Sequence, residues 1–281
     1  MRTTFALTAL MLCAWGTARA GCLDDIRASG VITAGNGIFG DKPSLWQDQD
    51  GTYHGLDWDI LQQLAKRLNI PRTKFVITEW TSLIPGLKSK RWDIILSDME
   101  VTQERLVRAK VLFSRPYLLL YDYVIVMQDS PVKTLADLKG KTLGSTLGTN
   151  DSLTAHQLVD DGIAAAVKDF NTFGDPFVAL RNGQVAAAVL DQATLSGQRQ
   201  LMTNLRTVGE PIRRRAKPEW AAAEAAAPYR LGSEAIAVRP ECTDLLAAID
   251  RALADMERDG TRQAILAKYG IWEKDQEKLL K

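Results

Sequence analysis

The chain has 281 residues, of which 46% are hydrophobic and 25% are charged, and this ordinary globular composition excludes collagen-like, disordered and membrane-embedded proteins. Because a single hydrophobic core stops growing at about 250 to 300 residues, the length favours two structural units over one. The 35 basic and 34 acidic residues nearly cancel, so the chain lacks the positive field that nucleic-acid binding requires.

Residues 1–20 have the pattern of a secretory signal peptide. Arg2 supplies a positive start, residues 5–15 form an apolar run, and Ala18 and Ala20 give a small-x-small cleavage site. A helix that spans a membrane needs about 20 apolar residues, so a permanent anchor is the weaker interpretation. We therefore predict cleavage after Ala20 and a mature protein located in the periplasm.

Two cysteines remain if the chain is cleaved there. Cys13 leaves with the signal peptide, whereas Cys22 and Cys242 stay as an even pair in an oxidising compartment. A disulfide and two separate thiols both stay open, because the sequence does not fix the distance between their Cα atoms. Lipidation of Cys22 is a third alternative, although Arg19 stands where a lipobox has an aliphatic residue.

The first part of the mature chain alternates strands and helices. Its clearest helical pattern places Leu61, Leu64 and Leu68 three and four residues apart, with Asp57 in the first turn and Pro71 after the end. In chain order we predict a helix over 23–28, a strand over 30–34, a hairpin turn over 47–52, a helix over 57–68, a strand over 75–78, a short helix over 82–87 and a strand over 92–97. Strands that alternate with helices pair in parallel in a sheet covered on both faces, so this part is predicted to be α/β.

The same alternation restarts in the second part of the chain. Asn182-Gly183 closes one helical segment, and the last long helix has Thr243 at its cap and Gly260 at its end. We predict strands over 121–127, 141–145, 185–190 and 235–238, and helices over 134–138, from 150 onward, over 176–181 and over 243–256. A second α/β unit therefore follows the first. The basic run at 213–217 is interpreted as a solvated face.

A series of motifs recurs in a characteristic order and spacing. They are residues 82–97, Val101-Thr102-Gln103-Glu104-Arg105, Phe113-Ser114-Arg115-Pro116-Tyr117, residues 55–60, Leu138-Lys139-Gly140-Lys141, Gly148-Thr149, Asp191, Asp259-Gly260-Thr261 and Lys268-Tyr269-Gly270. As a set they resemble the family 3 extracellular solute-binding proteins, the polar amino-acid binders of bacterial ABC importers. The resemblance covers nearly all of the mature chain.

The resemblance implies a two-lobed, type II periplasmic-binding-protein fold. Each lobe is then a mostly parallel sheet flanked by helices, and two hinge crossings near Leu119 and Gly232 join the lobes. Lobe 1 would comprise residues 21–118 and 232–281, and lobe 2 residues 119–231. Open α/β sheets bind ligands outside the carboxyl ends of their strands, which independently favours a site in the cleft.

The resemblance also implies how the backbone end of an amino acid is held. Arg105 matches the arginine that clamps the α-carboxylate, and a guanidinium suits this task because it presents a rigid fork of donors. Gly148, Thr149 and Asn150 open a helix whose free N–H groups favour an anion. Asp191 matches the aspartate on the ligand ammonium. The alternatives are a surface arginine, a plain glycine turn and a strand-end cap.

Two aromatic residues match positions where the family encloses the ligand side chain. These are Phe39 and Trp80, whose flat rings provide apolar area and can also face a cation. Core packing is the alternative for both. Asn36, in the glycine-rich loop after the first strand, is a further expected contact.

Asp98 and Glu100 depart from the family pattern, which usually has small or hydroxyl residues there. Two acids beside Arg105 repel a carboxylate by about 1 kcal/mol or more each at an effective dielectric constant near 20. Either Glu100 points outward, or it pairs with Arg105, or the ligand carries extra positive charge. If both acids face the cleft, the expected ligand is a basic amino acid, a diamine-like compound or another cationic derivative.

We therefore predict a monomeric periplasmic receptor, without a cofactor, that closes on a polar or cationic amino-acid-like molecule and presents it to an ABC permease. Signals for an enzyme are sparse, since His54 and His156 are the sole histidines and no H-E-x-x-H or G-x-S-x-G motif occurs. The alternative is a cyclohexadienyl or arogenate dehydratase, because these enzymes resemble the same family and Glu100 with a raised pKa could act as general acid.

Overall fold

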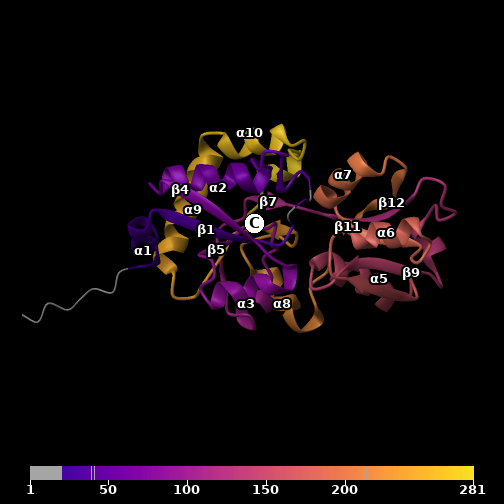
Figure 1. Cartoon of the computed structure of the whole chain (residues 1–281). Coiled ribbons are helices and arrows are strands. Elements are labelled where there is room, and N and C mark those ends of the chain that lie inside the picture. The colour runs from indigo at the N-terminus through magenta and orange to yellow at the C-terminus, as the bar shows by residue number, and fades with distance from the viewer. Residues whose placement is uncertain (1–20, 39, 41, 213) are drawn as a thin grey trace, which may run out of the picture.

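The computed structural model describes residues 21–281 except Phe39, Asp41 and Arg213. The predicted signal peptide and the predicted ligand contact Phe39 lie outside the described residues. Figure 1 shows two α/β bodies side by side, one holding both the indigo start and the yellow end of the chain and the other holding its middle. The two-lobed α/β architecture predicted from the sequence is thereby confirmed.

The first lobe contains a five-stranded sheet. Its strands, in spatial order, are β4 (Arg72–Ile77), β1 (Val31–Asn36), β5 (Ile94–Ile95), β14 (Ala237–Val238) and β6 (Leu112–Phe113). β1 runs parallel to β4 and β5, whereas β14 runs antiparallel to β5 and β6. The helices of this lobe include α1 (Cys22–Ser29), α2 (Leu56–Arg67), α3 (Leu83–Lys88), α9 (Thr243–Arg258) and α10 (Thr261–Lys268).

The apolar faces of α2 and α9 explain why these helices lie against the sheet. Leu61 and Leu64 of α2 are fully buried in one cluster with Ile32 of β1 and with Leu253 and Met256 of α9. Each fully buried side chain of this kind stabilises the fold by about 1.5 to 3 kcal/mol. Residues near both ends of the chain thus share a core, which makes the first lobe discontinuous in sequence.

The second lobe contains a sheet of the same size. Its strands, in spatial order, are β10 (Ala166–Phe170), β9 (Thr142–Thr146), β11 (Ala187–Asp191), β8 (Asp122–Met127) and β12 (Leu205–Ile212). Helices α5 (Asn150–Asp160), α6 (Asp175–Arg181) and α7 (Gln192–Leu201) flank it. Successive residues of β8 enter different cores, Val124 with Leu158 and Ile125 with Phe177. Because side chains alternate along a strand, both faces of this sheet are covered.

Two short strands lie where the chain passes between the lobes. β7 (Leu118–Leu119) pairs antiparallel with β13 (Ser233–Glu234). Gly232, just before β13, has φ +88°, and a Cβ atom there would lie 2.5 Å from the carbonyl oxygen of Leu120. Glycine is therefore required at this crossing on both conformational and steric grounds.

Several shorter elements lie outside the two main sheets. They are the hairpin β2 (Trp46–Gln47) and β3 (Tyr53–His54), α4 (Gln103–Val107) and α8 (Ala221–Ala226). The backbone N–H of Gln103 in α4 donates to Glu224 Oε1 of α8 at 2.7 Å, and Lys217 Nζ donates to Glu104 Oε2 at 2.6 Å. Part of the segment that we expected in lobe 2 therefore lies against lobe 1.

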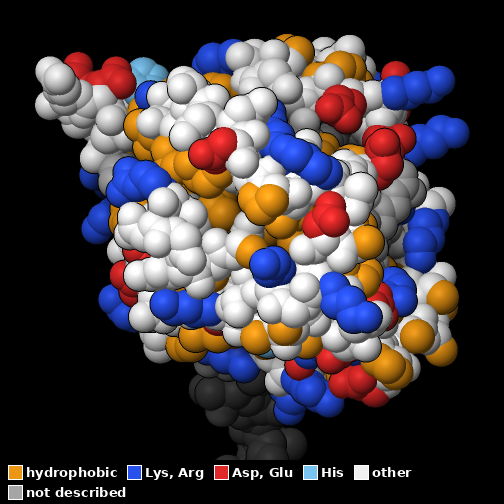
Figure 2. Space-filling model, turned by 90° about the vertical axis from the view of Figure 1, so that its right-hand side faces the viewer, with side chains coloured by type: hydrophobic (Ala, Val, Ile, Leu, Met, Phe, Trp, Pro, Cys, Tyr) orange, Lys and Arg blue, Asp and Glu red, His pale blue; other side chains and the backbone are white. Residues whose placement is uncertain are grey.

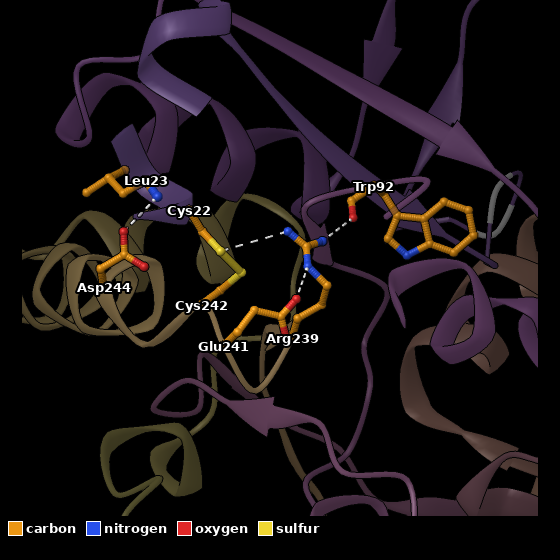
Figure 3. Close-up of a disulfide and its surroundings, with 7 residues drawn as sticks. All are labelled: Cys22, Leu23, Trp92, Arg239, Glu241, Cys242 and Asp244. Atoms are coloured by element: carbon orange, nitrogen blue, oxygen red, sulfur yellow. Dashed lines mark hydrogen bonds and ion pairs between the residues drawn. A yellow bond between two sulfur atoms is a disulfide. The ribbon is translucent and has the colours of Figure 1, made fainter. Parts of the chain in front are cut away.

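A disulfide joins α1 to the residue that precedes α9 (Figure 3). The Cα atoms of Cys22 and Cys242 are 5.3 Å apart. Beside the bridge, Leu23 N donates to Asp244 Oδ2 at 2.8 Å, and Arg239 Nη1 donates to the Trp92 carbonyl oxygen at 2.9 Å. The bridge thus fastens the start of the described chain to its last long helix.

On the face of the second lobe shown in Figure 2, basic and acidic side chains are intermixed. Within residues 21–281, apart from the three omitted positions, no helix is long and apolar enough to cross a membrane.

Candidate ligand-binding site

A small acidic cavity lies between the lobes. It encloses about 50 Å³, which is room for roughly four water molecules if each needs about 10 to 15 Å³. Both lobes contribute acidic side chains to its lining: Asp98, Glu100, Asp122, Asp151, Asp191 and Glu234. Among the described lining residues, Arg214 is the only lysine or arginine.

Asp98 enters the cavity from the first lobe, just after β5. It has φ +45°, in the left-handed region. Its Oδ2 accepts a hydrogen bond from Ser44 Oγ at 2.5 Å, and the Tyr117 hydroxyl lies 2.9 Å from its Oδ1. Burial raises the pKa of Asp98 to about 6. Since the same hydroxyl lies 3.3 Å from Asp57 Oδ1, the two buried carboxyls are linked.

Asn36 lies behind this pair and does not reach the cavity. It is the last residue of β1 rather than part of a loop, and its side chain is fully buried. Its Nδ2 donates to Asp57 Oδ2 and to the Leu96 carbonyl oxygen, both at 2.8 Å. Asn36 therefore orients Asp57 and does not line the cavity, where we had expected it to contact the ligand.

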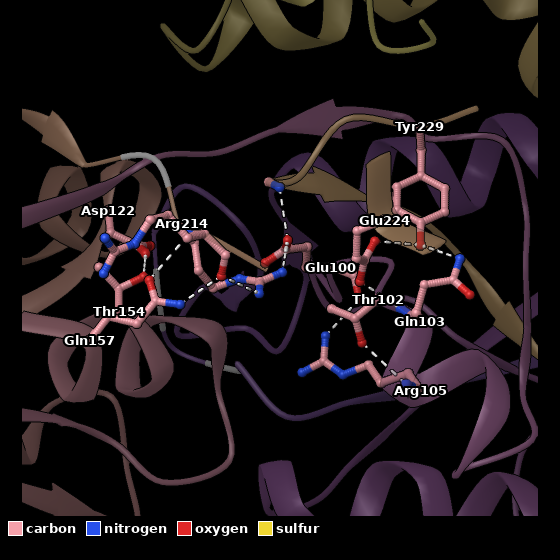
Figure 4. A network of polar contacts seen from close by, with 12 residues as sticks. Glu100, Thr102, Gln103, Arg105, Asp122, Thr154, Gln157, Arg214, Glu224 and Tyr229 are labelled. Atoms are coloured by element: carbon pink, nitrogen blue, oxygen red, sulfur yellow. Dashed lines mark hydrogen bonds and ion pairs between the residues drawn. The ribbon is translucent and has the colours of Figure 1, made fainter. Parts of the chain in front are cut away.

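Glu100 faces the cleft and pairs with Arg214, a residue of the basic run that we interpreted as a solvated face (Figure 4). Its Oε1 lies 2.6 Å from Arg214 Nη2 and accepts the backbone N–H of Gly232 at 2.8 Å. The Arg105 guanidinium contacts only the backbone of Glu100, through Nη1 and the carbonyl oxygen at 2.6 Å. Of the three alternatives, an outward Glu100 and a Glu100–Arg105 side-chain pair are both wrong. Arg214 follows β12 of the second lobe and therefore contacts Glu100 from the opposite side of the cleft.

Arg105 lies at the edge of the cavity rather than in its lining. α4 begins there because Thr102 Oγ1 accepts the Arg105 backbone N–H at 3.1 Å. The guanidinium carbon is 5.9 Å from the Trp80 ring centre, and Nη2 is 3.5 Å from the Gly148 carbonyl oxygen. Arg105 and Gly148 line a neighbouring groove, and Thr149 borders both that groove and the cavity.

The aromatic ring of Trp80 connects the two lobes. Its Nε1 donates to the Gly148 carbonyl oxygen at 3.0 Å, and its ring packs edge-on against Phe173 of the second lobe. Trp80 lines the cavity and also belongs to a buried cluster. Ligand contact and core packing, which we treated as alternatives, are therefore compatible at this residue.

The second lobe presents Asp191 and the start of α5. Asp191 ends β11 and caps α7, with Oδ1 accepting the Thr194 N–H at 2.9 Å and Oδ2 accepting the Thr194 hydroxyl at 2.8 Å. Burial raises its pKa. Thr149 caps α5 by accepting the Ser152 N–H at 3.2 Å, and Asn150 borders the cavity. Capping and cavity lining thus coincide in these residues as well.

Comparison with known proteins agrees with this geometry. The model of the bacterial extracellular solute-binding proteins, family 3, matches residues 37–271. The chain belongs to this family. As a family 3 solute-binding protein it has the two-lobed α/β fold that its motifs predicted.

Three relatives illustrate the range of the family. The L-cystine-binding protein TcyJ of Escherichia coli (strain K12) is 29% identical over 253 residues, covering 89% of this chain and 86% of that protein. The ABC transporter arginine-binding protein 1 of the same organism is 31% identical over 75% of this chain and 79% of its own length. A crystal structure of an ancestral amino-acid-binding protein, described as a precursor of cyclohexadienyl dehydratase, has a TM-score of 0.71, 25% identity and coverage of 89% and 99%.

Four charged lining residues of this solute-binding protein were not predicted from the sequence as parts of the site. Asp122 and Asp151 form a hydrogen-bonded acid pair in the second lobe, and burial raises the pKa of Asp122 to about 6. Glu234 lies on the crossing strand β13, and Arg214 lies in the basic run that we interpreted as a solvated face. That interpretation is wrong for Arg214, which is 9% exposed. An acid inside an apolar strand pattern was the signal available for Asp122.

The site offers no centre for a metal. Over the described part of the chain, no group of three or more histidine, cysteine or carboxylate side chains is arranged to hold a metal ion. His54 pairs with Asp48 and His156 with Asp169, and neither histidine lines the acidic cavity.

Proposed function

We propose that this solute-binding protein captures an amino acid, or an amino-acid-like molecule, that carries a positive charge besides its α-ammonium. The observation that supports this is the lining of the cavity, in which six carboxyl groups face one guanidinium. Burial raises the pKa values of Asp98, Asp122 and Asp191, and this disfavours their ionised forms while the cavity holds no cation. A cationic ligand would favour the ionised forms and offset the cost of burying them.

The expected contacts follow from the placement of each group. Asp191 lines the cavity and would bind the ligand ammonium, while Thr149 and Asn150 would offer the N-terminus of α5 to its carboxylate. Arg105 would swing its fork from the carbonyl oxygens of Glu100 and Gly148 onto the same carboxylate. Both lobes would then hold the ligand, so binding would favour the closed form.

We also propose a location and a partner for the protein. We infer that residues 1–20 are removed on export to the periplasm and that the mature chain is a monomer. An ABC permease would recognise the closed form. The names of the cystine-binding and arginine-binding relatives support the transport role.

We propose a thermal-shift screen of the mature protein against amino acids, polyamines and betaines. A ligand at 100 times its Kd adds about 2.7 kcal/mol to the free energy of unfolding, which is roughly 5 to 10 °C in Tm for a protein of this size. We expect such shifts from basic amino acids and smaller ones from neutral amino acids. The proposal fails if no compound of these classes shifts Tm or releases heat in calorimetry.

Arg105→Ala tests the predicted carboxylate clamp. Loss of charge-assisted hydrogen bonds worth about 3 kcal/mol weakens binding by about 100-fold, so the shift caused by any carboxylate-bearing hit should disappear. Arg108→Ala is the matched control, because Arg108 is an exposed arginine that pairs with Glu104 on the same helix turn. Equal shifts in the two variants would show that the clamp lies elsewhere.

The enzyme alternative has a separate test. The likeness to a precursor of cyclohexadienyl dehydratase keeps prephenate and arogenate as candidate substrates. We infer a binding role without catalysis, and we expect no turnover of either compound in an ultraviolet assay. Measurable product formation that Glu100→Gln abolishes would establish the dehydratase instead.

A further inference from the structure

A guanidinium of the protein itself occupies the hinge side of the cavity. Arg214 follows β12, and its neighbour Arg215 is fixed to α5, where Gln157 Nε2 donates to the Arg215 carbonyl oxygen at 2.6 Å and accepts its N–H through Oε1 at 3.1 Å. From this anchorage on the second lobe, Arg214 reaches Glu100 of the first lobe at 2.6 Å (Figure 4). The side chains are 6% and 4% exposed, so this is a fully desolvated ion pair between lobes.

One carboxyl oxygen of a second acid beside this pair has no hydrogen-bond partner among the described residues. Glu234 of β13 forms an isolated backbone bridge with Glu100, which brings the two acids next to each other. Glu234 is 5% exposed and lines the cavity, and its Oε2 has no hydrogen-bond partner among the described residues. Burial and the nearby charges of Glu100 and Asp98 raise its pKa well above the usual range. Glu100 is paired with Arg214, whereas the charge that offsets part of the pKa rise of Glu234 is that of Arg105.

The fit of Arg214 in this position is incomplete. Its Nε is buried without a hydrogen-bond partner, and its Nη1 donates to its neighbour's carbonyl oxygen at a long 3.4 Å. Because a buried donor and a buried acceptor each carry a desolvation cost when unpaired, Arg214 and Glu234 leave interactions that a better-placed cation would make. Two adjacent buried carboxyl groups are thus only partly satisfied by an arginine of the protein itself. This arrangement is expected of a ligand subsite in which a side chain of the protein takes the place of the ligand.

We propose that Glu100 and Glu234 form a subsite for a guanidinium or alkylammonium group of the ligand, and that Arg214 occupies this subsite and holds the lobes together until the ligand displaces it. This inference rests on the proposed function and adds to it a physical basis for discriminating cationic from neutral ligands. A ligand with a distal cation replaces the lost partner of Glu100. A neutral amino acid that expels Arg214 leaves Glu100 buried and unpaired, so it is rejected.

The tethered arginine also lowers the apparent affinity. When the binding-competent form is only a fraction of the population, the apparent Kd rises by the inverse of that fraction. If Arg214 occupies the subsite about nine-tenths of the time, its removal strengthens binding of a cationic group about tenfold. This gain distinguishes a tethered competitor from a residue that holds the ligand, whose removal weakens binding.

Methylguanidinium is the probe that tests the subsite. We expect millimolar methylguanidinium to raise the Tm of Arg214→Ala by several degrees, while the wild type and the Arg215→Ala control change little. Arg215 is a matched control because it is the neighbouring arginine but pairs with Asp161 in solvent. Adding Glu100→Gln or Glu234→Gln to Arg214→Ala should remove the response. A response in Arg214→Ala no larger than in the wild type would overturn the proposal.

Small-angle scattering supplies a second measurement, and Arg214→Gln a second variant if the alanine variant does not fold. Without ligand, both variants should have a larger radius of gyration than the wild type and Arg215→Ala, and methylguanidinium should reduce it. Variants as compact as the wild type would contradict the inter-lobe role. Since the probe is not an amino acid, its binding is independent of the amino-acid screen, and failure of one proposal is distinguishable from failure of the other.

Discussion

The titration of Asp98 is expected to affect both the stability of the fold and the binding of a ligand. Burial raises its pKa to about 6, and the pKa of Asp122 in the opposite lobe to the same value, whereas the unfolded chain has a value near 3.9. Between about pH 4 and pH 6 the folded protein therefore binds more protons than the unfolded chain. Its free energy of unfolding falls as pH rises through this window and levels off above it.

Ligand affinity should change in the opposite direction. A cation binds the ionised carboxylate, so the Kd of a cationic ligand should fall as pH rises through about 6. Urea unfolding and calorimetry across this range measure both effects. Asp98→Asn should flatten the pH profiles of both the unfolding free energy and the Kd. The control Asp129→Asn, at an exposed position, should leave both profiles unchanged. A wild-type protein whose unfolding free energy rises from pH 4 to pH 6 would contradict the pKa directions.

At the scale of residues, the structure brings together those predicted site residues whose position is set by local chain order. Asp98, Asp191 and Thr149 follow strands whose ends meet at the cleft, and all three line the cavity. Arg214 and Glu234 were missed because their importance arises from contacts across more than a hundred positions, as in the Arg214–Glu100 pair. A run of basic residues looks the same in sequence whether it is solvated or inserted between two lobes.

At the scale of elements, hydrophobic periodicity located about half of the described helices and strands. The helices predicted over 23–28, 57–68 and 243–256 differ from α1, α2 and α9 by at most two residues at either end. The strand predicted over 92–97 was too long, since only Ile94–Ile95 pair before the chain turns at Asp98. β12 was not predicted because Gly209 and Pro211 interrupt its apolar alternation. α8 was not predicted because its run of alanines has no clear apolar period.

The disulfide is the covalent link between two of these elements. It closes a loop with a sequence separation of 220 residues, for which the chain-entropy model gives a stabilisation of about 5 kcal/mol. Cys22→Ala with Cys242→Ala should therefore lower Tm markedly, as should reduction of the wild type. Differential scanning calorimetry measures the change. Because the bridge lies between α1 and α9, remote from the cavity, the Kd of a ligand should stay within about twofold below the lowered Tm; a large loss of affinity would contradict this separation.

For the whole molecule, contacts across the cleft set the relation between the lobes. Among them are the pairs Trp80–Gly148 and Arg214–Glu100, and the acidic cavity lies between the same two lobes. Ligand entry therefore requires these contacts to open while the β7–β13 crossing holds. The crossing is the element whose stiffness sets the equilibrium between open and closed forms.

Gly232→Ala tests the crossing. A non-glycine residue at φ +88° is strained by about 1 to 2 kcal/mol, and the added Cβ would lie 2.5 Å from the Leu120 carbonyl oxygen. Gly140→Ala is the matched control, because its φ is +75° and no atom lies within 4 Å of the added Cβ. Both variants should lose stability through the backbone, but only Gly232→Ala should also change the radius of gyration and the ligand affinity, since relief of the clash displaces the N–H that donates to Glu100. If the two variants behaved alike in scattering and calorimetry, closure would have to pivot at some other point of the chain.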